Sequence, residues 1–292
     1  MKKQLFFVSL LTLFATSAHS MNKQGYDEQE AWGPEEYDKN SQGQLQAGIE
    51  MLAEEQIPPN ATVVDFGCGT GNLAAHIATK IVPQGRVIGF DIDRNMIDYA
   101  KTKHDMIPNL EFRHNFFGVL QENSVDCIIS IYCLSWIKEF DNITAVMKEA
   151  ARCLKPGGQF VARFSIKHSD EHPLPFFRSV DEVIDEGRWW PFYRGAVPLV
   201  NSFDVQDYAR AMLDGGLYGR VFVVELPEYP CSRELIEDRL MSLPTGRMIP
   251  KPCRPKFFDD ILESLEKYAQ KNAKGDFLLV GKDCIIKAQK QI

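Results

Sequence analysis

The fold of this chain is decided by the stretch Val63-Val64-Asp65-Phe66-Gly67-Cys68-Gly69-Thr70-Gly71-Asn72-Leu73. It reads as a buried apolar strand that stops at an acid, followed by three glycines at alternate positions and then a helical pattern. Only a residue without a Cβ lets the backbone turn tightly and lie directly against a ligand. Three such residues between a strand and a helix predict a small-molecule cradle beside a helix N-terminus.

The spacing of the glycines discriminates between cofactors. A dinucleotide-binding loop has the pattern G-x-G-x-x-G, and this pattern fails because the third position after Gly69 is Asn72. Asp65 stands two residues before Gly67, where a pyrophosphate would meet a negative charge. A carboxylate at this place suits a cationic ligand, such as one that carries an ammonium group. A glycine-rich turn in an ordinary α/β protein stays open as the simpler interpretation.

Four landmarks, in the right order, resemble those of the Rossmann-like methyltransferases that use S-adenosylmethionine. Residues 65–71 resemble their motif I, 86–91 their second strand with its final acid, 124–130 their fourth strand, and 154–160 the "LKPGG" turn before the fifth. The resemblance implies an α/β fold with a doubly wound, mostly parallel seven-stranded sheet. It also implies that S-adenosylmethionine is the cofactor.

The same resemblance implies which residues hold this cofactor. Asp91 corresponds to the acid that accepts hydrogen bonds from both ribose hydroxyls. Asn115 stands where the family usually has an aspartate for the adenine amino group, so its side-chain oxygen would have to accept that bond. The expected cofactor-binding set is Tyr37, Asp65, Gly67, Gly69, Gly71, Asp91, Ile92, Asn115, Phe116 and Ser130.

A second resemblance concerns the methyl acceptor. Residues 130–137 resemble the segment after the fourth strand of the juvenile-hormone-acid methyltransferases, and residues 37–44 resemble their N-terminal Y-x-K-x-x-x-x-Q. Trp32-x-Pro34-x-x-Tyr37 is similar to the start of the trans-aconitate methyltransferases. Both families methylate carboxylates. The first implies that Gln44 and Trp136 hold the acceptor carboxylate and form the catalytic pair.

This pair is chemically sensible because an amide N–H and an indole N–H are uncharged donors. They orient a carboxylate and leave its nucleophilic lone pair available. Two other interpretations stay open, a core aromatic for Trp136 and a solvated helix position for Gln44. The family's histidine before the tryptophan is Ser135 here, which removes an aromatic donor from the pocket.

Further acceptor-binding residues are expected at the end of the sheet and beyond it. Arg163 lies near the carboxyl end of the strand predicted over 158–165, and an arginine in a buried sheet needs a partner that an acceptor carboxylate would supply. Residues 166–203 carry a dense aromatic group that includes Trp189 and Trp190. These aromatics predict an apolar substrate wall, with the alternative that they fill the core of their own segment.

The remaining elements follow from hydrophobic periodicity. Strands are expected near 62–67, 86–91, 109–114, 125–131, 158–165, 219–226 and 276–287, the last one antiparallel, and helices near 44–55, 71–81, 94–105, 141–154 and 255–271. Asp93 is expected to begin the helix over 94–105. The predicted organisation is a polar segment at 21–40 and a methyltransferase domain over 41–292 with cap insertions near 166–203 and 227–275.

The first twenty residues read as a leader. A basic start, an apolar run over 5–15 and the small-x-small site Ala18-His19-Ser20 are typical of a bacterial secretory signal, and the run is too short for a membrane span. Initiation at Met21 is the alternative and would leave the protein in the cytoplasm, where S-adenosylmethionine is made. Localisation therefore stays open, as does the oligomeric state.

Composition narrows the function further. The formal net charge of −7 makes nucleic acid an unfavourable partner, since phosphate binding needs a basic face. No C-x-x-C or His/Cys cluster predicts a metal site. We therefore expect methylation of a small molecule, with a carboxylic acid converted to its methyl ester. A hydroxyl, amine or carrier-bound acyl acceptor stays open, as does a catalytically silent module that binds S-adenosylmethionine.

Overall fold

The computed structural model describes residues 33–291 except 115–116, 167, 170–171, 186, 194–199 and 202. The predicted leader over 1–20 and residues 21–32 of the polar segment lie outside the described residues. The described part of that segment forms α2 (Pro34–Asn40).

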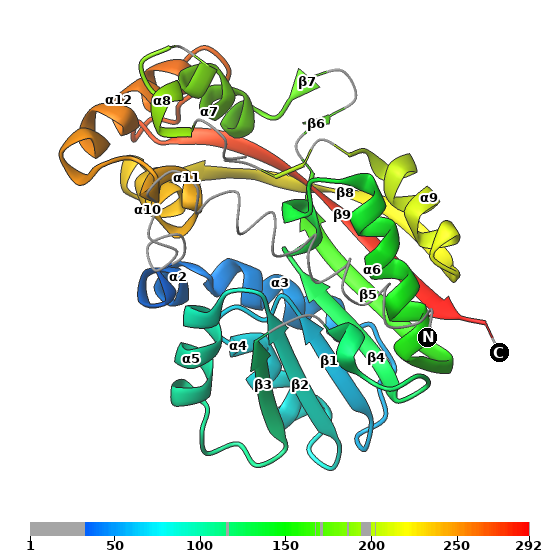
Figure 1. The fold of residues 1–292 in the computed structure, drawn as a ribbon. Coiled ribbons are helices and arrows are strands. Elements are labelled where there is room, and N and C mark those ends of the chain that lie inside the picture. The colour runs from blue at the N-terminus through cyan, green and yellow to red at the C-terminus, as the bar shows by residue number, and fades with distance from the viewer. Residues whose placement is uncertain are drawn as a thin grey trace.

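Seven strands form one mixed sheet in the order β3-β2-β1-β4-β5-β9-β8 (Figure 1). Their bounds are β1 (Thr62–Phe66), β2 (Arg86–Asp91), β3 (Leu110–His114), β4 (Val125–Ile131), β5 (Leu154–Ser165), β8 (Leu217–Cys231) and β9 (Phe277–Lys290). The first five are parallel, and β9 is antiparallel to both β5 and β8. The predicted doubly wound, mostly parallel sheet with an antiparallel last strand is confirmed.

Helices cover both faces of this sheet. The bounds are α3 (Gln42–Leu52), α4 (Asn72–His76), α5 (Arg94–Lys103), α6 (Phe140–Cys153) and α9 (Val205–Asp214). Val63 and Ile129 point to the face that α3, α4 and α5 cover, whereas their neighbours Val64 and Ile128 point to the face under α6 and α9. Successive strand residues are therefore buried on opposite faces, which explains the continuous apolar runs in the sequence.

Two helix boundaries show how local chemistry decides the ends. Asp93 caps α5, as predicted, because its side chain accepts hydrogen bonds from the N–H groups of Asn95 and Met96 at 2.8 and 3.1 Å. The single helix predicted over 71–81 instead changes after His76 into the π-helix η2 (Ile77–Ile81). The wider turn is held by the Asn109 side-chain amide, which donates to the carbonyls of residues 78 and 82 at 3.0 Å.

The strands β8 and β9 continue beyond the end of β5 and carry a second layer of helices. Ser165, the last residue of β5, pairs with Asp283, and from there β8 and β9 pair only with each other as far as Cys231 and Phe277. The helices on this extension are α7 (Pro175–Asp185), α8 (Trp190–Tyr193), α10 (Arg233–Ser242), α11 (Pro244–Arg247) and α12 (Arg254–Leu265). We call these helices, with the extension, the cap (Figure 1).

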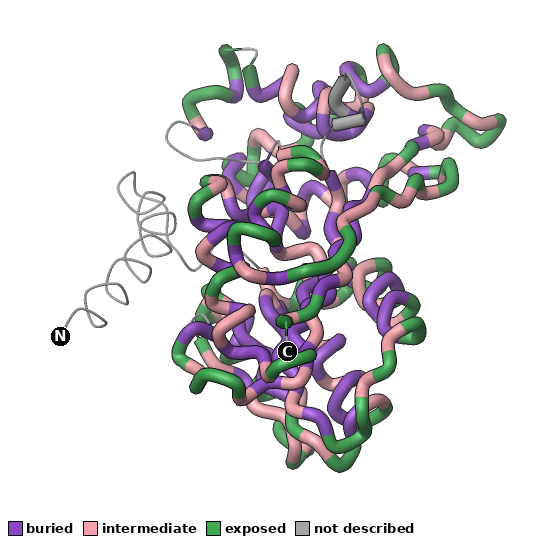
Figure 2. The backbone as a smooth tube through the Cα atoms, turned by 90° about the vertical axis from the view of Figure 1, so that its right-hand side faces the viewer, coloured by how far each residue is buried: buried purple, intermediate pink, exposed green. Residues whose placement is uncertain are grey.

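The cap has an apolar core of its own. Phe177, Val180, Phe257 and Ile261 are buried there against Leu279 of β9. Figure 2 shows buried segments both in the sheet body and in the cap above it. The short elements that complete the fold are η3 (Phe117–Val119), η4 (Leu134–Trp136), η5 (Lys251–Cys253) and the small ribbon of β6 (His168–Ser169) and β7 (His172–Pro173).

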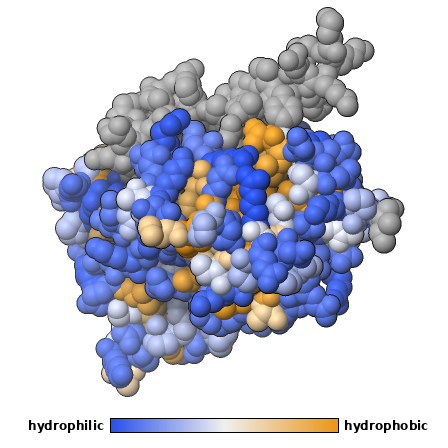
Figure 3. All heavy atoms as spheres, turned by 90° about the horizontal axis from the view of Figure 1, so that it is seen from below, coloured by the Kyte–Doolittle hydropathy of each residue, from blue (hydrophilic) through white to orange (hydrophobic). Residues whose placement is uncertain are grey.

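The opposite end of the molecule, seen in Figure 3, is mainly hydrophilic with apolar residues in scattered patches. Across the described residues, no helix is both long enough and apolar enough to span a bilayer.

Candidate functional site

The glycine loop follows β1 at the carboxyl end of the sheet. Gly67 and Gly69 both have left-handed backbones, with φ of +76° and +52°. A Cβ on Gly67 would lie 2.4 Å from Sγ of Cys133, so only glycine fits there. The N–H of Gly69 donates to Oδ2 of Asp91 at 2.9 Å, and Gly71 is the N-cap of α4. The loop is thereby fixed against the end of β2.

Asp65 lies beneath this loop and carries an unsatisfied oxygen. Its side chain is 2% exposed, and the N–H of Ala74 in the first turn of α4 donates to the carboxylate. Among the residues that the structure describes, Oδ2 has no hydrogen-bond partner. Burial, and secondarily the charge of Asp91, raise the pKa of Asp65 to about 7. A buried carboxylate with an unsatisfied oxygen favours a ligand that donates a hydrogen bond to it, and a positively charged donor most of all.

Asp91 ends β2 and faces the same loop. Its Oδ1 accepts from the N–H of Asp93 at 2.9 Å and its Oδ2 from Gly69, so each oxygen keeps one lone pair for a ligand. Burial raises the pKa of Asp91 to about 6, against the effect of these two N–H donors. The next residue, Ile92, is 50% exposed. The carboxylate of Asp91, which can accept two further hydrogen bonds, is therefore followed directly by the exposed apolar side chain of Ile92.

Helix α2 closes the other side of the loop. Cε1 of Tyr37 lies 3.1 Å from the position that a Cβ on Gly69 would take. Burial and the nearby charge of Asp91 raise the pKa of Tyr37, so its phenol stays protonated. The adjacent Asp38 accepts from Nζ of Lys103 at 2.5 Å and from Nδ2 of Asn72 at 2.9 Å. The contacts of Asp38 with Lys103 and Asn72 thus fix the part of α2 that places Tyr37 over Gly69.

The same helix is also fixed to the cap. Nη1 of Arg247, in α11, lies 2.6 Å from Oε2 of Glu36. Helix α2 therefore contacts both the sheet body and the cap. No motif in the sequence indicated these pairs, because their members lie far apart along the chain.

The other expected cofactor residues are placed differently. Ser130 is fully buried, and its hydroxyl donates to the carbonyl of Phe66 at 3.0 Å. That hydroxyl links β4 to β1. Asn115 and Phe116 lie outside the described residues.

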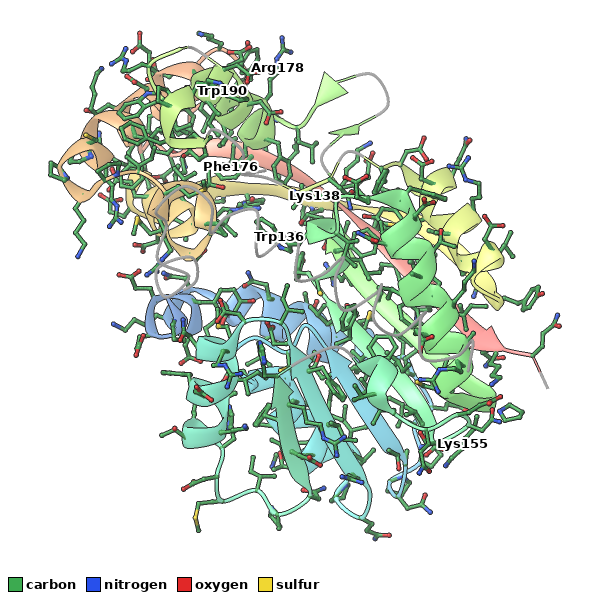
Figure 4. All side chains as sticks on the ribbon, in the orientation of Figure 1. Trp136, Lys138, Lys155, Phe176, Arg178 and Trp190 are labelled. Atoms are coloured by element: carbon green, nitrogen blue, oxygen red, sulfur yellow. The ribbon has the colours of Figure 1, made fainter. Side chains whose placement is uncertain are left out.

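The expected catalytic pair comes from two elements that border the carboxyl ends of β1 and β4. Gln44 is half-buried in α3, one turn before Ala47 and Gly48, which pack against the sheet. Trp136 is half-buried at the end of η4, and Nζ of Lys138 lies 5.6 Å from its ring centroid. Figure 4 shows Trp136 between the sheet body and the cap, with Lys138 beside it.

Arg163 already has a carboxylate partner within the protein. Its Nε donates to Oδ2 of Asp283 at 2.8 Å, and the same oxygen accepts from the hydroxyl of Tyr132 at 2.7 Å. Asp283 is fully buried, and Ser165 donates to its second oxygen. The carboxylate expected from an acceptor is therefore Asp283 of β9. An isolated acid within the apolar strand 277–290 was the sequence signal for this cluster.

The two tryptophans of the expected substrate wall have different surroundings. Trp189 is 4% exposed in the core of the cap, and its indole N–H donates to Asp260 at 2.8 Å. Its hydrogen-bonding group is thus used within the cap, in agreement with the alternative that these aromatics fill their own core. Trp190 is 48% exposed on α8 and lies at the far side of the cap (Figure 4).

The chemistry at this end of the sheet is that of a ligand site. Two acids with raised pKa values, a glycine turn, an exposed apolar residue and a tyrosine converge there. Within the described part of the chain, no group of three or more His, Cys, Asp or Glu side chains is arranged to hold a metal ion.

Comparison with known proteins matches residues 63–158 to the family described as a methyltransferase domain. A putative methyltransferase 235L of Invertebrate iridescent virus 6 is 35% identical over 128 residues, which are 41% of this chain and 46% of that relative. A trans-aconitate 2-methyltransferase of Deinococcus radiodurans is 32% identical over 141 residues, 47% of this chain and 50% of that relative. The chain thus spans about half the length of these curated relatives.

A solved structure extends the likeness beyond this region. Geranyl diphosphate C-methyltransferase from Streptomyces coelicolor, in complex with S-adenosyl-L-homocysteine, superposes with a TM-score of 0.52 at 17% identity. The superposition covers 85% of this chain and 76% of that one. At this identity the likeness concerns the fold.

Proposed function

We propose that this chain transfers a methyl group from S-adenosylmethionine to a small molecule, because residues 63–158 match the methyltransferase domain family. The observation that carries the proposal is the buried Oδ2 of Asp65, which lies beneath a glycine loop and has no partner in the described part of the chain. A site with this feature fits a ligand with an ammonium group, and S-adenosylmethionine carries one.

The other residues of the loop fit the same cofactor. The free lone pairs of Asp91 would accept hydrogen bonds from the ribose hydroxyls, and Ile92 would cover one face of the adenine. Tyr37 would close over the ligand from α2. The structural relative from Streptomyces coelicolor, whose complex contains S-adenosyl-L-homocysteine, supports the assignment.

When bound, S-adenosylmethionine supplies a methyl group on a sulfonium centre, from which a nucleophile can displace it. This displacement needs orientation and exclusion of water more than acid or base catalysis. The protein's part is therefore to hold the acceptor in line and to cover it. Helix α2 and the cap border the place where this has to happen.

We propose a carboxylic acid as the acceptor and a methyl ester as the product. A carboxylate is ionised at neutral pH, so its methylation needs no general base to remove a proton. Gln44 and Trp136 would donate to the oxygen that is not attacked. The relative from Deinococcus radiodurans, named for trans-aconitate, supports a carboxylate acceptor.

Calorimetry with S-adenosylmethionine and S-adenosylhomocysteine tests the cofactor. We expect both to bind the wild type and to bind Asp91→Ala at least about tenfold more weakly, because a hydrogen bond to a charged group is lost. Asp141→Ala removes an exposed acid at the start of α6 and serves as the control. Unchanged affinity in Asp91→Ala would overturn the assignment.

Incubation with a panel of acids, amines and phenols, read by mass spectrometry, tests the acceptor. We expect methyl esters and release of S-adenosylhomocysteine. Turnover of an amine or phenol without any ester would refute the carboxylate, and binding without any turnover would indicate a silent module.

A further inference from the structure

The arginines of the cap differ in whether a carboxylate pairs with their charge. Four pair with carboxylates, namely Arg178 with Glu182, Arg188 with Asp260, Arg233 with Glu237 and Asp259, and Arg247 with Glu36. Arg254 donates to two backbone carbonyls. Arg239, in α10, pairs with no carboxylate among the residues that the structure describes. Because an unpaired charge is unfavourable in a half-buried place, its position calls for an anionic partner.

Arg239 is nevertheless held in a defined orientation. Its Nη1 donates to the hydroxyl of Tyr229 at 2.9 Å, and its guanidinium carbon lies 4.6 Å from the ring centroid of the buried Phe176. The ring fixes the plane of the guanidinium, and the hydroxyl takes one of its five N–H donors without neutralising the charge. A planar fork of N–H groups remains for a ligand.

The charge of Arg239 reaches the carboxyl end of β4. It lowers the pKa of Tyr132, although burial and Asp283 raise that pKa overall. Tyr132 follows β4 directly, with a left-handed backbone at φ +53°, and lies four residues before Trp136. Figure 4 shows Phe176, on which Arg239 stacks, on the side of the cap that is nearer to Trp136. Arg239 is therefore on the cap side of the acceptor region.

We propose that Arg239 binds a second carboxylate of the acceptor, distinct from the one that is methylated; this inference rests on the proposed function. An oxygen held in a tight pair with a guanidinium is a weakened nucleophile, because its lone pairs are engaged by a charge-assisted bond. The uncharged donors Gln44 and Trp136 suit the reacting carboxylate, and the charged fork of Arg239 suits a group that only positions the molecule. The acceptor is accordingly a dicarboxylic acid with an apolar body.

The test compares dicarboxylic acids from succinate to dodecanedioate with the monocarboxylic acids of the same lengths. Methyl esters are quantified with saturating S-adenosylmethionine for the wild type, R239M, R239K and R233M. We expect the wild type to favour a diacid over the matched monoacid. R239M should lose about 10- to 100-fold in kcat/KM for that diacid, mainly through KM, and retain its monoacid activity.

The controls separate charge from packing. R239M keeps an apolar stem against Phe176, and R239K keeps the charge without the planar fork, so it should be intermediate. R233M removes an exposed, paired arginine from the same helix and should match the wild type.

Two results would overturn the inference: an unchanged diacid kcat/KM in R239M, or no preference for any diacid in a wild type that binds S-adenosylhomocysteine. The failure of the wild type to bind S-adenosylhomocysteine would overturn the proposed function itself. Thermal melting of each variant shows that a loss arises at the site, and R239K provides the comparison if R239M does not fold.

Discussion

Replacing Asp65 by asparagine should make the protein more stable and its cofactor site weaker. Burial raises the pKa of Asp65 from its ordinary 3.8 to about 7. A rise of this size corresponds to at most about 4 kcal/mol of destabilisation when the carboxylate is ionised. The asparagine amide itself remains without a partner on one side, so we expect a gain of about 1–3 kcal/mol. For a domain of this size, that gain raises the melting temperature by roughly 2–10 °C.

The pH dependence gives the reasoning a sharper test. The pKa of Asp65 is higher in the folded than in the unfolded state, so its ionisation destabilises the fold. This effect is absent below about pH 4, grows as the pH rises and is complete above about pH 7. The difference in melting temperature between Asp65→Asn and the wild type should follow the same course. Groups that titrate in both proteins cancel in that difference.

Although Asp65→Asn should stabilise the fold, it should weaken the binding of the cofactor. Without the carboxylate, the affinity for S-adenosylmethionine at about pH 8 should fall about 10- to 100-fold. Wild-type affinity should itself fall about tenfold per pH unit below pH 7, as Asp65 becomes protonated, and Asp65→Asn should lack most of this dependence.

Differential scanning fluorimetry and calorimetry across the pH range measure both effects. Asp91→Asn is the matched comparison: both Asp91 oxygens accept backbone N–H groups, so an amide there would face a donor and no gain in stability is expected. The reasoning is refuted if Asp65→Asn is no more stable than the wild type at about pH 8. It is equally refuted if the variant binds the cofactor with undiminished affinity.

Two further predictions concern the glycine loop and the cap. Gly69→Ala should cost about 1–2 kcal/mol through its positive φ and weaken S-adenosylhomocysteine binding, because the new methyl group meets Tyr37. Gly157→Ala, which has a positive φ and open space around it, should show the stability loss alone in denaturant titrations and calorimetry. Trp189→Phe should cost about 1 kcal/mol by removing the donor to Asp260 and leave the acceptor KM unchanged. A raised KM at unchanged melting temperature would instead place Trp189 in the substrate wall.

The arrangement around the glycine loop was predictable because its determinants are close together in sequence. Residues 63–73 carry the strand, the turn and the start of the helix in one run. Asp91 could be found because β2 is the next strand, and its pairing brings Phe90 level with Phe66. That register places the acid beside the glycine turn, where the N–H of Gly69 meets it.

The partners of the expected acceptor residues were less predictable because hydrogen bonds and ion pairs across long sequence separations leave no local pattern. Arg163 is paired with Asp283, 120 positions away, and Trp189 with Asp260, 71 positions away. Each arginine or tryptophan indicates that a partner exists, but its identity depends on how β9 and α12 pack. The π-helix η2 was missed for a related reason, since it depends on the distant side chain of Asn109.

Helix α2 contacts both the glycine loop and the cap, so it could couple the two halves of the proposed site. Its seven residues hold Tyr37 over the glycine loop, Asp38 against Lys103, and Glu36 against Arg247 of the cap. A ligand that displaced Tyr37 would therefore also move Glu36 and disturb its ion pair with Arg247 of the cap. By reciprocity, an acceptor that stabilised the cap would then change the affinity for the cofactor by the same factor. In that case the seven residues of α2 would couple the two binding events.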